Sequence, residues 1–337
     1  MPGLNEAQFA LSGVSPRQIQ QYSPVANGAQ YFLSKGYKTP NRDVEMVLCL
    51  PSDPQCNKPI IRNTVNSPGF GEAGLRLTFT REGLPIMIIP QARYASADNR
   101  VTGYTIQSCQ DVLCENGFST SSTSLPFNLT GKAYCQGTSV DVALNRFGFP
   151  TWLTLCGSEL NLIHCLTQTC NQTSVVQFVV DPNWVYFVYL AVDSQFRFSI
   201  VTSGQTGQSD ITYIRCLDAD CSQSIQSQLT IPSKTKQRLV GTRVQFVINP
   251  KTDLPIFHFT ASEYPSNIPV YQFIPCTNVE CSDLSEIIDY GVSLGFNQLR
   301  VSEMLVDNQG IVIAALRVNN AITNQTLNAF VRIAQRH

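Results

Sequence analysis

Pairs of cysteines separated by four residues recur along the chain and are its most reactive feature. One pair supplies only two thiolates, whereas a structural zinc site requires four protein ligands. Redox catalysis favours Cys-x-x-Cys beside a βαβ unit, which is absent. We therefore predict five local disulfides, each across one tight turn. In the first pair the two cysteines are further apart in the sequence than in the others. The predicted bonds are Cys49–Cys56, Cys109–Cys114, Cys165–Cys170, Cys216–Cys221 and Cys276–Cys281.

Two further cysteines, Cys135 and Cys156, fall outside this spacing. A hairpin that turns at 146–149 would bring them close together, which favours a sixth disulfide over two free thiols. The alternative is an activated Cys–His pair that uses His164. A packing role within a strand is the favoured interpretation of that histidine.

The three histidines are dispersed, which disfavours a catalytic zinc site. His258 stands between two phenylalanines and is expected to be an interior residue. No Gly-x-Gly-x-x-Gly, P-loop or Gly-x-Ser-x-Gly motif occurs, so the sequence predicts no metal, no cofactor and no catalytic residue.

The composition limits which kinds of partner and which cellular environment are expected. Charged residues make up 14% of the chain, the net charge is −1 and no basic run occurs, which argues against nucleic-acid binding. No run of about 18 apolar residues is present, so no membrane span is expected. Twelve cysteines indicate an oxidising environment, extracellular or on a virion, although no signal peptide is visible. The sequons at Asn128, Asn171 and Asn324 fit that environment.

The cysteine pairs also mark a repeat, since their first cysteines are 60, 56, 51 and 60 residues apart. Each unit begins with a β-type run, a turn of the Gly-[Leu/Phe]-Pro type and a second β-type run. A third run then precedes the cysteine pair, and a fourth run follows it. One unit is therefore four antiparallel strands, with the cysteines between the third and fourth. The expected fold is all-β, a single domain over 1–337 that forms a six-bladed β-propeller. The blades are expected at about 15–70, 75–131, 139–181, 184–232, 242–291 and 298–337.

The last unit lacks a fourth strand, and the segment 5–12 is free to supply it. Closing the ring with strands from both ends would leave no open blade. Five or seven blades remain alternatives, because the first unit is the weakest repeat.

This pattern resembles the propeller repeats of poorly characterised secreted bacterial proteins and of some large DNA virus proteins. It is also similar in outline to sialidase-type propellers. The sialidase Asp-box, Ser-x-Asp-x-Gly-x-Thr-Trp, is absent, so the resemblance transfers no catalytic residue.

The first strand of each blade lines the central channel of a propeller, and its residues are a candidate site. Inter-blade ion pairs are the favoured interpretation of this ring. The alternative is a polar ligand site, in which arginines hold an anionic group while Asp141 and Glu303 act on a sugar as acid and base. Counting back from each turn gives the ring Gln21, Arg76, Asp141, Tyr189, Arg243 and Glu303.

The loops at 91–100, 203–209 and 262–268 would project from one face of a propeller. Arg93, Tyr94, Arg100 and Tyr264 are residue types that contact surfaces favour. The alternative is that these loops are solvated and have no role.

The function expected from these features is a non-enzymatic binding or structural module that recognises a protein or glycan partner through this loop face. The alternative is a carbohydrate-active enzyme, a glycosidase or lyase, at the channel mouth. The oligomeric state is left open by the sequence.

Overall fold

The fold is all-β in the part of the chain that the structure describes. The computed structural model describes residues 5–7, 18–24, 30–35, 44–50, 52, 60–63, 76–80, 83–92, 101–124, 135–156, 158–180, 187–203, 210–230, 238–264, 268–282, 284, 288–289, 298–306, 312–319 and 326–333. Every element there is a β-strand, and no described helix is long and apolar enough to cross a membrane.

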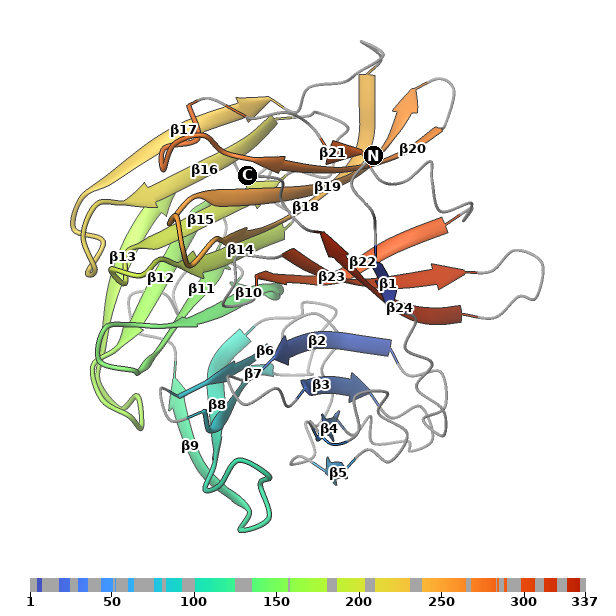
Figure 1. Cartoon of the computed structure of the whole chain (residues 1–337). Helices are drawn as coiled ribbons and strands as arrows, with labels where there is room; N and C mark the ends of the chain where they lie inside the picture. The colour runs from blue at the N-terminus through green and yellow to red at the C-terminus, as the bar shows by residue number, and fades with distance from the viewer. Residues whose placement is uncertain are drawn as a thin grey trace.

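The described strands form six four-stranded antiparallel sheets, which we number 1 to 6 along the chain (Figure 1). Sheet 1 is β2 (Gln18–Pro24), β3 (Gln30–Lys35), β4 (Val44–Cys49) and β5 (Ile60–Asn63). Sheet 2 is β6 (Arg76–Phe79), β7 (Pro85–Ala92), β8 (Val101–Cys109) and β9 (Phe118–Ser124). Sheet 3 is β10 (Cys135–Leu144), β11 (Pro150–Cys156), β12 (Glu159–Cys165) and β13 (Thr173–Val179).

The second half of the chain repeats the same order. Sheet 4 is β14 (Phe187–Val192), β15 (Phe198–Ser203), β16 (Asp210–Cys216) and β17 (Ser224–Thr230). Sheet 5 is β18 (Arg238–Ile248), β19 (Pro255–Tyr264), β20 (Ile268–Pro275) and β21 (Ile288–Asp289). Sheet 6 is β22 (Gln298–Val306), β23 (Val312–Asn319), β24 (Thr326–Ile333) and, at its outer edge, β1 (Asn5–Ala7).

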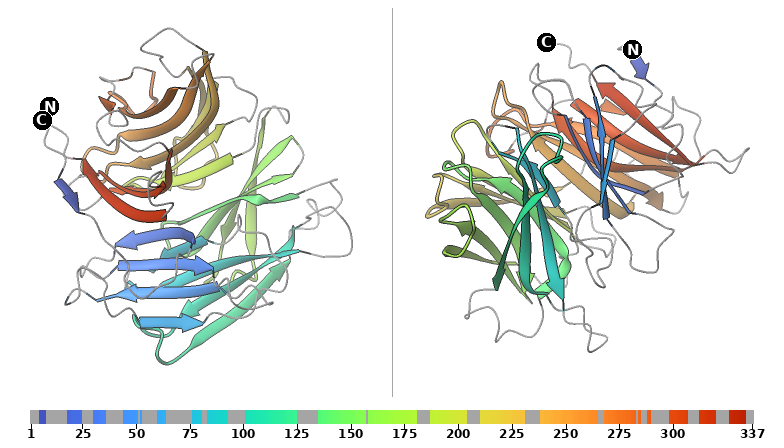
Figure 2. Two further views of the ribbon diagram at one scale, coloured as in Figure 1. Left: turned by 90° about the vertical axis from the view of Figure 1, so that its right-hand side faces the viewer. Right: turned by 90° about the horizontal axis from the view of Figure 1, so that it is seen from below.

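The first strands of successive sheets contact one another. The contacts run from β2 to β6, β10, β14, β18 and β22, and β22 in turn contacts β2 (Figures 1 and 2). Four-stranded meanders that meet through their first strands have the arrangement of propeller blades. The expected propeller-like all-β architecture is therefore confirmed.

The N-terminal strand completes the last sheet, as expected. β1 pairs antiparallel with β24, with Asn5 opposite Arg332 and Ala7 opposite Phe330. The pairing confirms the prediction for residues 5–7, whereas residues 8–12 lie outside the described residues. Because β1 covers the free edge of β24, sheet 6 has the same number of strands as the others.

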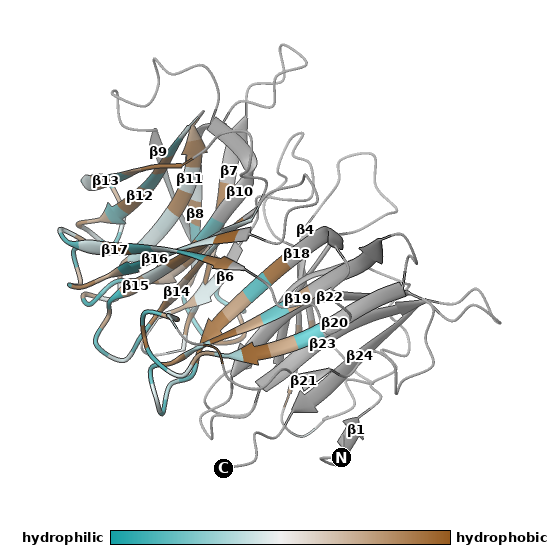
Figure 3. Cartoon of the chain, turned by 90° about the horizontal axis from the view of Figure 1, so that it is seen from above, coloured by the Kyte–Doolittle hydropathy of each residue, from teal (hydrophilic) through white to brown (hydrophobic). Residues whose placement is uncertain are grey.

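The core lies between the sheets rather than within one layer. The middle strands β11 and β15 are buried along their whole lengths, because each of their faces packs against a neighbouring sheet. The outer strand β13 alternates between exposed and covered residues. Figure 3 shows the same contrast, with a largely hydrophilic β17 at the outside of sheet 4.

Deletion of residues 1–14 should destabilise the protein, because it removes β1 and exposes the edge of β24. We expect the melting temperature to fall by about 2 °C or more, since about 1 kcal/mol shifts a large domain by roughly that amount. Deletion of residues 1–4 alone, which leaves β1 in place, is the control. Identical melting curves for the two deletions would contradict the closure of sheet 6 by β1.

Candidate functional site

Four of the predicted local disulfides are present, and each closes the turn between the third and fourth strands of a sheet. Their Cα–Cα distances are 5.0, 4.7, 4.8 and 5.1 Å, within the usual range for a disulfide. All eight cysteines are buried. The bonds are Cys109–Cys114, Cys165–Cys170, Cys216–Cys221 and Cys276–Cys281.

These cysteine turns share one backbone geometry. The second cysteine of each pair has a positive φ between 51° and 55°, the left-handed region that L-residues rarely adopt. Its N–H donates to the carbonyl of the residue two positions after the first cysteine, at 3.0 to 3.3 Å. The disulfide and this hydrogen bond together hold the second cysteine in its unusual conformation.

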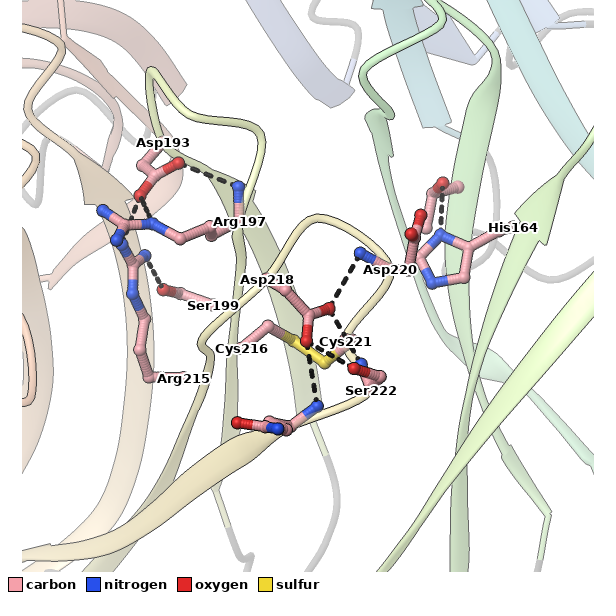
Figure 4. The surroundings of a disulfide bond; sticks show 12 residues. His164, Asp193, Arg197, Ser199, Arg215, Cys216, Asp218, Asp220, Cys221 and Ser222 are labelled. Carbon is pink, nitrogen blue, oxygen red and sulfur yellow. Dashed lines mark hydrogen bonds and ion pairs between the residues drawn. A yellow bond between two sulfur atoms is a disulfide. The ribbon is translucent and has the colours of Figure 1, made fainter.

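A polar residue two positions after the first cysteine stabilises each of these turns. In sheet 4, Asp218 Oδ1 accepts the N–H groups of Asp220 (3.1 Å) and Ser222 (2.9 Å), as Figure 4 shows. Hydrogen bonds from Ser222 hold the pKa of Asp218 below its usual value. The equivalent residues in sheets 2, 3 and 5 are Asp111, Thr167 and Asn278. The signal Cys-x-[Asp/Thr/Asn]-x-x-Cys was present in the sequence, but the spacing analysis missed it.

The other four cysteines are described only in part. Cys156 is in a disulfide and lies directly opposite Cys135 in the pairing of β10 with β11. This position agrees with the expected Cys135–Cys156 bond. The side chain of Cys49, and all of Cys56, lie outside the described part of the chain.

The alternative prediction, an activated Cys–His pair, is wrong. Cys156 is oxidised, and it pairs with Glu159 at one end of the β11–β12 hairpin, while His164 lies at the other end, opposite Thr151. The packing role expected for His164 is confirmed, since its ring lies 5.2 Å from that of Phe198 in sheet 4.

The two described histidines are buried and neutral at physiological pH. Burial lowers the pKa of His164 to about 4 and that of His258 to about 3. His164 Nδ1 shares a hydrogen bond with the Thr151 hydroxyl at 3.1 Å, while its Nε2 has no hydrogen-bond partner. Asp220, on the cysteine turn of sheet 4, lies beside this ring (Figure 4), and its charge partly opposes the fall in the pKa of His164. Among the described residues, no group of three or more His, Cys, Asp or Glu is arranged to hold a metal.

The strand registers test the alignment of the channel ring. Gln21, Arg76, Asp141, Tyr189 and Glu303 each pair with the fourth residue of the following strand, so they are equivalent positions. In sheet 5 the equivalent residue is Gln245, opposite His258, and not Arg243.

Arg243 lies two residues before that position, beside a register shift between Val240 and Arg243. The turn that joins β18 to β19 is also one residue longer than the corresponding turns. The matching position is therefore identified by the pairing of β18 with β19 and not by a count from the turn. The side chains of Gln21, Arg76, Arg243 and Glu303 lie outside the described side chains.

Asp141 uses both of its carboxylate oxygens on backbone amides. Oδ1 accepts the N–H of Val142 at 3.0 Å, and Oδ2 accepts the N–H of Leu190 at 2.7 Å. Leu190 belongs to β14, so this carboxylate joins the first strands of sheets 3 and 4. Both carboxylate oxygens of Asp141 are therefore engaged by backbone amides, one on its own strand and one on sheet 4.

A buried ion cluster lies in sheet 4, where the sequence analysis predicted none. The Asp193 carboxylate accepts hydrogen bonds from Arg197 Nε, at 2.7 Å, and from the buried Arg215. Burial alone would raise the pKa of Asp193, but the Arg197 hydrogen bonds and the Arg215 charge outweigh it and keep that pKa below its usual value. Arg215 Nη1 also donates to Ser199 Oγ at 2.7 Å (Figure 4). The Asp193 carboxylate thus pairs with two guanidinium groups, and such pairing with additional hydrogen bonds is how buried charges persist.

The predicted loop-face residues are mostly outside the described part of the chain. Arg93, Tyr94 and Arg100 cannot be placed, and Tyr264 was wrongly placed in a loop. Residues Ser262–Tyr264 continue β19, where Tyr264 pairs with Arg238. Of the three sequons, Asn171 is described. It is exposed on the cysteine turn of sheet 3, and its Oδ1 accepts a hydrogen bond from Thr167 Oγ1 at 2.6 Å.

Comparison with known proteins supports the fold and leaves the activity open. No family model and no curated protein matches this sequence. Among solved structures, a polysaccharide lyase described as a family PL25 ulvan lyase is similar at a TM-score of 0.54 and 10% identity, over 98% of this chain and 84% of that chain. A protein from Lactobacillus plantarum is similar at 0.52 and 10% identity, over 94% and 85%. A putative 6-phosphogluconolactonase from Bacteroides uniformis is similar at 0.50 and 10% identity, over 91% and 82%.

Peptide mapping without reductant should find six disulfides. We expect cross-linked peptides that join Cys49 to Cys56 and Cys135 to Cys156, in addition to the four bonds observed. The reason is that the first pair repeats the cysteine turn and the second pair is opposed across β10 and β11. Peptides that join Cys49 or Cys56 to Cys135 or Cys156 would contradict this pairing.

Stability should fall as the pH is lowered below neutrality. The pKa of His164 is about 4 in the folded protein, below the unfolded value of about 6.5. The contribution of its neutral form is therefore complete above pH ~6.5 and is lost as the pH falls towards about 4. In urea unfolding from pH 7 to pH 5, His164→Gln should show a smaller loss of stability than the wild type. Equal losses in the two proteins would exclude this histidine as the cause.

Proposed function

We propose that this chain is a single six-bladed β-propeller that acts as a non-enzymatic binding or assembly module. Six sheets, the contact of β22 with β2 and the pairing of β1 with β24 support a ring of six blades rather than five or seven. Sheets 3 and 5 begin at Cys135 and Arg238, before the starts at 139 and 242 expected from the repeat, and sheet 6 contains strands from both ends of the chain.

The observation that carries the non-enzymatic assignment is the use of Asp141. This residue is the inner-strand carboxylate whose side chain is described, and both of its oxygens hold backbone amides of sheets 3 and 4. Other described carboxylates are also engaged in hydrogen bonds or ion pairs within the fold. Asp111 and Asp218 cap cysteine turns, Asp193 neutralises arginines, and Asp253 accepts hydrogen bonds from Ser194. A glycosidase requires a pair of carboxylates free to face the substrate.

The proposed location is extracellular or on a virion. Four buried disulfides in the described residues fit an oxidising environment. The proposed partner is a protein or a glycan, bound at the face formed by the loops between the second and third strands. Arg93, Tyr94 and Arg100 lie between β7 and β8 in the sequence and outside the described residues, and Tyr264 ends β19.

A glycosidase or lyase at the channel mouth is the second candidate. It is favoured by the equivalent register positions of Arg76, Asp141 and Glu303, which place a basic and two acidic residues on the first strands of three sheets. The fold similarity to an ulvan lyase adds only that such a fold accommodates a polysaccharide enzyme elsewhere.

A glycan array and a polysaccharide depolymerisation screen that detects both hydrolysis and eliminative cleavage, on the same preparation, separate the two candidates. We expect no turnover by the wild type, and binding that is lost in the Tyr94→Ala, Tyr264→Ala double variant. Asp141→Asn and Glu303→Gln should leave that binding unchanged, and their melting curves control for folding. Turnover that either carboxylate variant abolishes, while its fold stays intact, would establish the enzyme instead.

A further inference from the structure

The cysteine turn of sheet 2 is one residue longer than those of sheets 3 and 4. In all three turns the residue after the first cysteine donates its N–H to the carbonyl of the residue that precedes the fourth strand. That carbonyl belongs to Gln172 in sheet 3 and to Gln223 in sheet 4, two positions after the second cysteine. In sheet 2 it belongs to Gly117, three positions after Cys114. An extra residue therefore lies between the disulfide and β9.

The longer turn places two residues in solvent, and a glycine returns the chain to the strand. Glu115 and Asn116 are both exposed. Gly117 has a φ of 85°, a left-handed conformation that glycine adopts without steric cost. The hydrogen bond that closes this turn, from Gln110 N–H to Gly117 O, is 3.3 Å long, against 2.9 Å for the equivalent bonds of sheets 3 and 4. The turn of sheet 2 therefore has the longest closing hydrogen bond of the three.

This geometry puts the dipeptide Asn116–Gly117 at the surface of the turn. The backbone nitrogen that follows an asparagine attacks the side-chain amide carbon of that asparagine when no bulky side chain stands in the way, and glycine has none. No atom outside the neighbouring residues lies within 4 Å of the position that a Cβ of Gly117 would occupy, so the space there is open. The Gly117 N–H donates no hydrogen bond within the described part of the chain. The attacking group is therefore accessible.

We propose that Asn116 is a deamidation site, at which the Gly117 nitrogen attacks the Asn116 side-chain amide in the folded protein. The nitrogen forms a bond to Cγ of Asn116, the Cγ–Nδ2 bond breaks, and the Nδ2 group leaves as ammonia with the proton of the Gly117 N–H. Water then opens the cyclic imide at one of its two carbonyl carbons. The product is aspartate, or isoaspartate, in which the main chain runs through the former side chain. The reaction requires only water.

The modification reverses an interaction that stabilises this turn. The Asp111 carboxylate accepts the N–H groups of Asn116, at 2.7 Å, and of Glu115, at 3.0 Å. These backbone hydrogen bonds lower the pKa of Asp111 most, and the Asn116 side-chain amide donates to the same carboxylate and adds to them. Deamidation replaces that donor by a second carboxylate beside the first, and like charges repel. We therefore expect the turn to loosen and its disulfide, Cys109–Cys114, to be reduced more readily.

The cysteine turn of sheet 3 provides an internal control. Asn171 is exposed and directly follows the second cysteine of that turn. It is followed by Gln172, whose side chain hinders attack by its own backbone nitrogen. The chain also contains Asn27–Gly28, which lies outside the described residues and is followed as a separate peptide. The modification does not depend on the proposed function, because it involves no binding partner.

The test is peptide mapping of the oxidised full chain after incubation at neutral and at alkaline pH. Aspartate and isoaspartate should accumulate at position 116 several-fold faster than at Asn171, and faster at alkaline pH because the attacking nitrogen must lose its proton. Gly117→Asn should slow the reaction several-fold. Asparagine tolerates a positive φ, and its side chain has room there and hinders the attack. A reductant should cleave Cys109–Cys114 several-fold faster in the incubated protein than in fresh protein.

Three results would overturn the proposal. The first is an Asn116 that stays intact in the folded protein but deamidates in the same chain unfolded in urea. The second is equal deamidation at Asn116 and Asn171, and the third is an unchanged rate in Gly117→Asn. Melting curves check the fold of each variant. If Gly117→Asn is unfolded, Asn116→Gln replaces it, and an equal gain in disulfide reduction after incubation of this variant and of the wild type also overturns the proposal.

Discussion

The structure depends on the burial of both faces of each sheet by its neighbours. The middle strands β11 and β15 are buried along their whole lengths, so both faces of these strands need a neighbour. Stacked repeats of this kind bury a continuous core only when every face has a neighbour. An open row of sheets would leave two such faces exposed at its ends. The pairing of β1 with β24, together with the contact between β22 and β2, removes those ends.

Several of the described polar side chains join neighbouring sheets. Asp141 joins sheets 3 and 4 through the Leu190 amide, and Tyr213 donates from sheet 4 to the Val279 carbonyl of sheet 5 at 2.9 Å. Ser194 and Asp253 join the turns of sheets 4 and 5 in the same way.

Much of the fold could be predicted from local sequence signals, because they repeat. The cysteine spacing predicted the turns between the third and fourth strands, and the Gly-[Leu/Phe]-Pro signal predicted the hairpins between the first and second strands. The lack of a fourth strand in the last unit indicated that the N-terminal segment supplies it. The failures concern longer-range geometry. Arg243 was wrongly assigned to the channel ring, since the register of β18 against β19 puts Gln245 at that position, and register cannot be read from one strand alone. The Asp193–Arg215 pair joins residues 22 positions apart, and nothing in the local sequence around either residue predicts the pairing.

Native-state hydrogen exchange of the first strands tests the central claim most directly. If the sheets depend on their neighbours around a closed ring, amides in β10 and β14 should exchange only through one shared, global opening. The Leu190 amide, which Asp141 holds, should share that behaviour, and Asp141→Ala should speed exchange in both sheets 3 and 4. Sheets that open one at a time with different free energies, or a change confined to sheet 3, would contradict the account.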